Sequence, residues 1–251
     1  MKRLTFIILA ISIWGCMYSQ VITKEEIERY TDLDGTSWTK RAKELSEQYS
    51  LNEKGELQLS IIKEFEGQTK QGLYKKILNW IISLSTEAES ALQIADNENG
   101  RIVTRCYLPN IAKRTMGDNS YKVSIRPLLS FDFKDGRIRF TFLLQNYNVS
   151  KKNDDSGYVF MFGNGFGVTG NGVTKENQIW LLKDCYPFAE SKQGGYDDMY
   201  ELSSSTNRSS RIKHPKVTSS RAFVNSISCY KILVDKIDEV VSRSLEDDGD
   251  W

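Results

Sequence analysis

The residues that could carry out chemistry are few, and they exclude several kinds of site. The single histidine, His214, lies among cations at residues 211–216, where a solvated side chain is expected rather than a catalytic base. One histidine also excludes a histidine-rich metal site. No two cysteines have the C-x-x-C spacing of a redox motif or a zinc knuckle. The sequence therefore predicts no catalytic residue and no metal ligand.

A glycine-rich run at residues 165–170 fits the pattern G-x-G-x-x-G of dinucleotide-binding loops. That function also requires a helix that begins at the third glycine and an acidic residue about 20 positions further on. Asn171 and Gly172 follow instead of a helix, and Asp184 comes too early. The serines have no G-x-S-x-G motif, and no acidic cluster has the spacing of a calcium-binding loop. We therefore expect no cofactor.

The composition is that of a folded globular protein. The chain has 251 residues, of which 39% are hydrophobic and 27% are charged. Its 34 Lys and Arg residues balance 33 Asp and Glu residues, so no overall electrostatic attraction to nucleic acid is expected. The length indicates one domain, or one domain with a substantial insertion.

Residues 1–20 predict an export signal. Two basic residues precede an uncharged apolar run at 4–14, which is too short to span a bilayer. Two cleavage sites stay open, an ordinary one after Ser19 and a lipoprotein-type site at which Cys16 would become the point of lipid attachment. We expect the mature protein in the periplasm or cell envelope, either soluble or held at the membrane only through that anchor.

Cleavage near residue 20 leaves an odd number of cysteines, namely Cys106, Cys185 and Cys229. An oxidising compartment permits a disulfide, but at least one thiol is then left over, and the pairing stays open. Cys106 and Cys229 lie within apolar patterns, which favours buried and unreactive thiols.

Hydrophobic periodicity predicts the main elements. Residues 21–56 form a polar helical leader, loosely held and made of two short helices. A strand begins at Leu57, and Thr69 caps a helix with apolar residues at helical spacing. Further antiparallel strands are predicted at 91–95, 101–108, 123–133 and 138–142, so that residues 57–148 make up one domain.

Residues 149–221 lose this periodicity and are rich in glycine and serine, which predicts a surface insertion. Within it, 158–162 and 178–182 are candidates for one hairpin. An amphipathic helix at 222–245, capped by Ser219 or Ser220, completes the domain. An acidic tail follows at residues 246–251.

Two helices with one apolar stripe each must bury that stripe on a sheet with one alternating face. We therefore predict an α+β fold, in which a single antiparallel sheet of about five strands carries both helices on one face. The other face is left to solvent, and the insertion precedes the C-terminal helix.

Three short motifs resemble one protein family. They are QTKQGLY at 68–74 with Trp80, NGRI at 99–102 and KDGRIR at 134–139. These motifs resemble the secreted domains of unknown function found in Bacteroidetes, whose fold is like half of the TATA-box-binding protein. The resemblance covers roughly residues 57–148 and implies a TBP-like α+β fold and an envelope setting. It implies no activity and no catalytic residue, because the family has no established one.

Strand alternation places a group of cations on the solvent face of the predicted sheet. The predicted binding residues are Arg101, Arg105, Tyr107, Lys122, Arg126, Arg137 and Arg139. The simpler interpretation is a solvated face that Glu64, Glu66 and Asp132 partly neutralise. The functional interpretation is a docking face for an anionic glycan, a lipid headgroup or an acidic envelope protein. Nucleic acid is not an expected partner in that compartment.

The sequence thus favours a non-enzymatic binding or interaction module of the cell envelope. The alternative is a hydrolase-like enzyme whose site is formed by the insertion at 149–221 over the sheet, for example with two carboxylates across a groove. A domain that only spaces other envelope proteins is the third hypothesis.

Overall fold

The computed structural model describes residues 22–31, 33, 36–84, 91–116, 119–154, 160–162, 165–167, 173–189, 203–205 and 216–243. The predicted export signal, Cys16, His214 and the acidic tail lie outside the described residues. No helix within the described ranges is long and apolar enough to cross a membrane.

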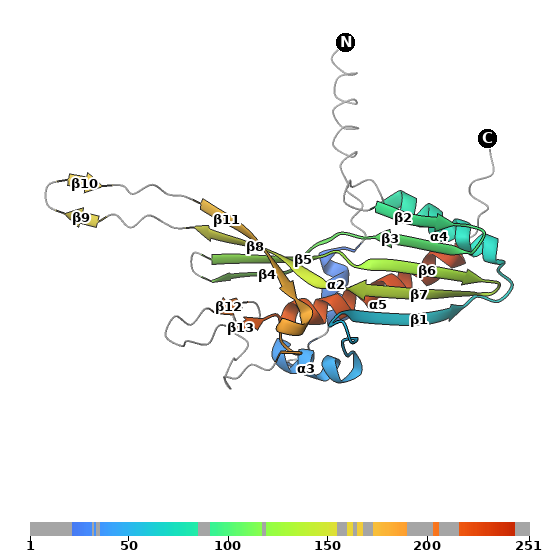
Figure 1. Ribbon diagram of the computed structural model, residues 1–251, viewed down its shortest axis with the longest axis horizontal. Coiled ribbons are helices and arrows are strands. Elements are labelled where there is room, and N and C mark those ends of the chain that lie inside the picture. The colour runs from blue at the N-terminus through green and yellow to red at the C-terminus, as the bar shows by residue number, and fades with distance from the viewer. Residues whose placement is uncertain are drawn as a thin grey trace, which may run out of the picture.

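The strands form two main antiparallel sheets rather than one (Figure 1). The five-stranded sheet has the order β1 (Leu57–Glu64), β7 (Arg137–Leu144), β6 (Leu128–Lys134), β3 (Arg101–Arg105) and β2 (Ala91–Asp96). The four-stranded sheet has the order β11 (Val173–Leu181), β8 (Asn146–Asp154), β5 (Asn119–Ile125) and β4 (Leu108–Met116). The α+β class is confirmed, whereas the prediction of a single sheet was wrong.

The two sheets share a chain path, because β3 leads into β4, β5 into β6 and β7 into β8. The predicted strand at 123–133 is therefore two strands, with Arg126 and Pro127 between them. Pro127 has no backbone N–H to donate to a neighbouring strand, so the ladder is interrupted at this position. Apolar alternation continues on both sides of Pro127, which is why one long strand was predicted.

Helices α4 (Lys70–Leu84) and α5 (Ser220–Ser242) cover the same face of the five-stranded sheet. The Tyr74 ring of α4 lies edge-on to Phe133, with centroids 5.5 Å apart, and the Tyr230 ring of α5 stacks on Phe140 at 6.0 Å. The strand residues on this face are fully or almost fully buried, namely Leu57, Leu59, Ile102, Leu129, Phe131, Phe133, Ile138, Phe140 and Phe142. The predicted packing of two helices on one face is confirmed.

Helix α5 runs along both sheets (Figure 1). Near its start, Asn225 is buried and its Nδ2 donates a hydrogen bond of 2.6 Å to the carbonyl oxygen of Ile111 in β4. Further along, Tyr230 packs on the five-stranded sheet. One helix therefore joins the two sheets into a common core.

The leader is not loosely held, contrary to the prediction. Helices α2 (Lys24–Thr31) and α3 (Trp38–Gln48) both contact α5, and Ile27, Ala42 and Leu45 are buried. Polar contacts add to this packing, since Lys236 Nζ on α5 lies 2.7 Å from Glu26 Oε1 on α2. The leader is mostly polar, so its few apolar residues gave no sign in the sequence that they would pack on α5.

The three family-like motifs meet at one end of the five-stranded sheet. The Lys70 backbone N–H donates a 2.7 Å hydrogen bond to Asp135 Oδ1, and Lys70 Nζ donates to the carbonyl oxygen of Glu98 at 2.7 Å. Gly136 and Gly100 both have positive φ, 70° and 63°, in the turns that receive these contacts. Residue types that look unrelated in the sequence are thus parts of one junction between α4 and two hairpins.

The predicted insertion at 149–221 begins within the second sheet. β8 pairs along its whole length with β11, so 178–181 belongs to that ladder. The expected partner segment instead contains β9 (Phe160–Phe162), which pairs with β10 (Gly165–Gly167). β8 carries mostly polar side chains, with Tyr147 and Val149 buried, and its alternation is therefore weak in the sequence.

Candidate functional site

The outer face is the side of both sheets that turns away from α4 and α5. On its five-stranded half, two predicted binding residues meet one acid. Arg139 binds Asp132 Oδ2 through Nε at 3.1 Å and Nη2 at 2.9 Å, and Arg101 Nε lies 3.6 Å from Asp132 Oδ1. The three residues are direct neighbours on β3, β6 and β7. The interpretation that Asp132 partly neutralises this face is therefore confirmed by ion pairs.

Arg137 lies at the far end of the same half and is exposed. It stands directly opposite Glu64 of β1 on one side and Lys134 of β6 on the other. Arg137 therefore faces an acid on one side and a second cation on the other, so only one of its two cross-strand neighbours offsets its charge.

Arg105, Tyr107 and Arg126 lie where the two sheets meet. The guanidinium carbon of Arg126 is 4.9 Å from the centroid of the Tyr107 ring, and Tyr107 Oη donates a hydrogen bond of 3.5 Å to Ser124 Oγ. One face of the aromatic ring is therefore covered by a cation from the same chain. The flat aromatic contact that the sequence predicted at Tyr107 is occupied on that side.

Lys122 lies on the four-stranded half, away from the arginines of the other sheet. It is exposed, and it stands directly opposite the exposed Lys113 of β4. The exposed Lys152 of β8 pairs with Ser120, two residues before Lys122 on β5. We call Lys113, Lys122 and Lys152 the lysine patch. The side chains around it in the same rows are hydroxyls and amides, namely Ser124, Asn148, Ser150 and Asn177.

Lys113 and Lys152 are not among the predicted binding residues, because neither β4 as a separate strand nor β8 was predicted. The sequence did contain a signal for these strands. Apolar and polar residues alternate from Tyr121 to Ile125, and Tyr147 and Val149 have the same two-residue spacing. Such a pattern predicts one buried and one open face for this second group of strands.

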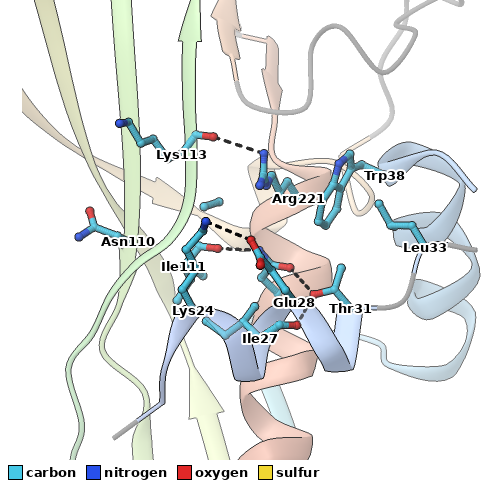
Figure 2. Close-up of a pocket in the computed structure, with 12 residues that line it drawn as sticks. Lys24, Ile27, Glu28, Thr31, Leu33, Trp38, Asn110, Ile111, Lys113 and Arg221 are labelled. Carbon is cyan, nitrogen blue, oxygen red and sulfur yellow. Dashed lines mark hydrogen bonds and ion pairs between the residues drawn. The ribbon is translucent and has the colours of Figure 1, made fainter. Parts of the chain in front are cut away.

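A cavity of about 430 Å³ lies behind the lysine patch, between α2, the start of α5 and the edge strand β4 (Figure 2). The Arg221 guanidinium carbon is 4.8 Å from the centroid of the Trp38 ring, and Nη1 donates to the carbonyl oxygen of Lys113 at 3.4 Å. The Thr31 hydroxyl donates to Asn225 Oδ1 at 2.9 Å. The side chain of Lys113 itself points away from the cavity (Figure 2).

The polar groups of this cavity bind one another and hold the fold together. Asn225 and Arg221 bind carbonyl oxygens on the outer edge of β4, the edge that faces away from β5, and so fasten α5 to this edge strand. Among the described lining residues, Glu28 is the one carboxylate, and it pairs with Lys24 at 3.1 Å. A pair of carboxylates facing each other across a groove, as a glycosidase needs, is not formed by these residues.

The three described cysteines are buried, and they form no disulfide with one another. Burial raises the pKa of Cys185 to about 12 and raises that of Cys229 as well, so both thiols stay protonated at neutral pH. Thiolate nucleophiles are therefore not present at these two positions. Among the described residues, no group of three or more His, Cys, Asp and Glu side chains is arranged to hold a metal ion.

Residues 61–148 match the model of DUF4468, a domain of unknown function with a TBP-like fold. This match lies within residues 57–148, the range for which the sequence motifs predicted a TBP-like fold. The matched segment includes α4, most of the five-stranded sheet, and β4 and β5 with Lys113 and Lys122.

Two solved structures are similar to the chain. One is a TBP-like protein from Parabacteroides distasonis ATCC 8503, with 12% identity over 76% of this chain and 95% of that chain, and a TM-score of 0.43. The other is a DUF4468 family protein from Bacteroides ovatus ATCC 8483, with 9% identity over 79% of this chain and 96% of that chain, and a TM-score of 0.39. No curated protein matches the chain.

Proposed function

We propose that the protein is a non-enzymatic binding module of the cell envelope, and that its lysine patch docks an anionic partner. The observation that carries this proposal is the direct opposition of Lys113 and Lys122 on neighbouring strands. Two like charges at paired positions of a sheet destabilise it. A partner that supplies phosphate, sulfate or carboxylate groups would remove this repulsion.

The surroundings of the two lysines support binding rather than internal pairing. Neither lysine takes part in an ion pair with another described residue, in contrast to Arg101 and Arg139. The hydroxyl and amide side chains beside them are able to bind anionic oxygen atoms as well. The envelope setting of the proposal rests on the export signal predicted at residues 1–20.

The test is binding of dextran sulfate, a soluble polyanion without an apolar part, to the variant Lys113→Gln/Lys122→Gln. We expect the affinity at low salt to fall roughly tenfold, and its salt dependence to become shallower, because exposed charges are screened over about 8 Å at physiological ionic strength. The matched control is Lys43→Gln/Lys75→Gln, which removes two exposed lysines from α3 and α4. Equal affinity of the parent and the patch variant would refute the proposal.

A further inference from the structure

Two exposed apolar side chains stand beside the lysine patch. Ile179 is 67% exposed and Leu181 is 42% exposed, and both are on the edge strand β11. They are two residues apart on a regularly paired strand, so their side chains point to the same face. Leu92 and Ile94 on β2 have the same spacing, but a bulge lies between them. Leu92 pairs with Thr104 and Ile94 with Val103, which are consecutive residues of β3, so Leu92 and Ile94 point to opposite faces.

The register places this pair on the outer face with the lysines. Ile179 pairs with Asn148, which pairs with Ser124, and Ser124 is two residues from Lys122 on β5. Two strand spacings and one two-residue step put the backbones of Ile179 and Lys122 roughly 12 Å apart. A lysine side chain covers much of that distance, so cationic and apolar groups form one continuous surface.

Exposed aliphatic side chains add no binding free energy with a soluble polyanion such as dextran sulfate, because the polyanion presents charged and hydroxyl groups. They do add binding free energy at a surface that has anionic groups at its boundary and hydrocarbon beneath it. Apolar insertion and attraction of cations to acidic headgroups act together in interfacial binding to membranes. An extended sheet face also suits a planar partner better than a narrow one.

We propose that the anionic partner of the lysine patch is a lipid membrane surface. Lys113 and Lys122 bind headgroup phosphates, and Ile179 and Leu181 enter the boundary between headgroups and acyl chains. This inference rests on the proposed function, since it names the chemical class of the same site's partner. It also adds a membrane contact by the folded domain to the one expected through Cys16.

The other half of the outer face provides an internal control. Ile62 of β1 is 58% exposed on the outer face, so it resembles Ile179 in size and exposure. It stands opposite Arg139, whose charge is bound by Asp132. If apolar exposure alone sufficed for membrane binding, Ile62 would contribute as much as Ile179.

The experiment measures co-sedimentation of the mature protein with vesicles of phosphatidylcholine alone or mixed with phosphatidylglycerol, beside dextran sulfate binding. The variants are Ile179→Ser/Leu181→Ser, Ile62→Ser and Lys113→Gln/Lys122→Gln. Thermal unfolding of each variant checks that the fold is intact, which we expect because the substituted side chains are exposed.

We expect the parent to bind the mixed vesicles and not those of phosphatidylcholine alone. Ile179→Ser/Leu181→Ser should lower vesicle binding by roughly fivefold or more and leave dextran sulfate binding unchanged, and Ile62→Ser should change neither. Unchanged vesicle binding of the serine pair, or no vesicle binding by the parent, overturns the membrane inference. The proposed function stands in both cases if the lysine variant loses dextran sulfate binding, and it fails if that variant does not.

Discussion

Both halves of the outer face carry cations, but these cations have different cross-strand neighbours. On the five-stranded half, Asp132 lies between Arg101 and Arg139 and binds both. On the four-stranded half, Lys113 and Lys122 face each other, and hydroxyl or amide side chains surround them. The charges of Arg101 and Arg139 are thus neutralised within the chain, whereas Lys113 and Lys122 form no ion pair with another described residue.

This difference shows that the register between strands, rather than the number of cations, decides which surface is available to a partner. Asp132 has its effect because it is the direct cross-strand neighbour of both arginines. One acid on the central strand thus pairs with two cations. No described acid has that position relative to Lys122, whose direct neighbours are Lys113 and Ser150.

The comparison requires that both halves belong to one folded unit, and α5 is the element that joins them. Ile227 is 1% exposed in this helix, between the contacts to β4 and those to the five-stranded sheet. Ile227→Asp buries an unpaired charge, and we expect a loss of several kcal/mol in the free energy of unfolding. Urea unfolding followed by circular dichroism and by tryptophan fluorescence measures this loss.

Ser242→Asp, at the exposed end of the same helix, is the control and should cost little. If Ile227→Asp had the same unfolding midpoint as the parent, α5 would not be part of the hydrophobic core. Two separate transitions in the parent would show that the halves fold independently.

A substitution at the motif junction should affect the five-stranded half without changing the lysine patch. Gly100 has φ of 63°, and a Cβ atom there would collide with the Lys70 side chain and lie 3.0 Å from the carbonyl oxygen of Phe133. We expect Gly100→Ala to lower the free energy of unfolding by about 1–3 kcal/mol. Thermal unfolding measures it, and dextran sulfate binding below the transition should equal that of the parent.

Gly67→Ala separates the two causes of this loss. Gly67 also has a positive φ, 76°, but no atom lies within 4 Å of the added Cβ. Its substitution should therefore cost less than that of Gly100. Equal losses at the two glycines would mean that backbone conformation alone matters and that the close contact at the junction is unimportant.

The five-stranded half could be predicted from the sequence because its buried face is dense and regular. Phe131, Phe140 and Phe142 alternate with polar residues, and the pair Asp135 and Gly136 marks the turn between their strands. The apolar spacing of α4 and α5 is equally regular, and both helices were placed correctly. Parity along these strands also assigned the arginines to the outer face.

The four-stranded half was not predictable in the same way, because its strands break the alternation. β4 contains Pro109 and then Asn110 with φ of 51°, and both Ile111 and Ala112 are buried after this irregularity. The register shifts between Leu108 and Ala112 as a result. The opposition of Lys113 and Lys122 depends on that shift, so sequence spacing alone could not show it.

The sharpest test converts the neutralised half into one like the lysine patch. Asp132→Asn keeps the size and the accepting oxygen of the side chain but removes the charge that Arg101 and Arg139 share. The two arginines are more than half exposed, so the ion pairs are screened by water, and we expect a loss of only about 0.5–1 kcal/mol in stability. Affinity for dextran sulfate at low salt should rise several-fold, because two released guanidinium groups become available to sulfate.

Asp184→Asn removes one exposed negative charge elsewhere and controls for the change in net charge. If both substitutions raised the affinity equally, net charge alone would explain the increase, and the pairing by Asp132 would not be what distinguishes the two halves.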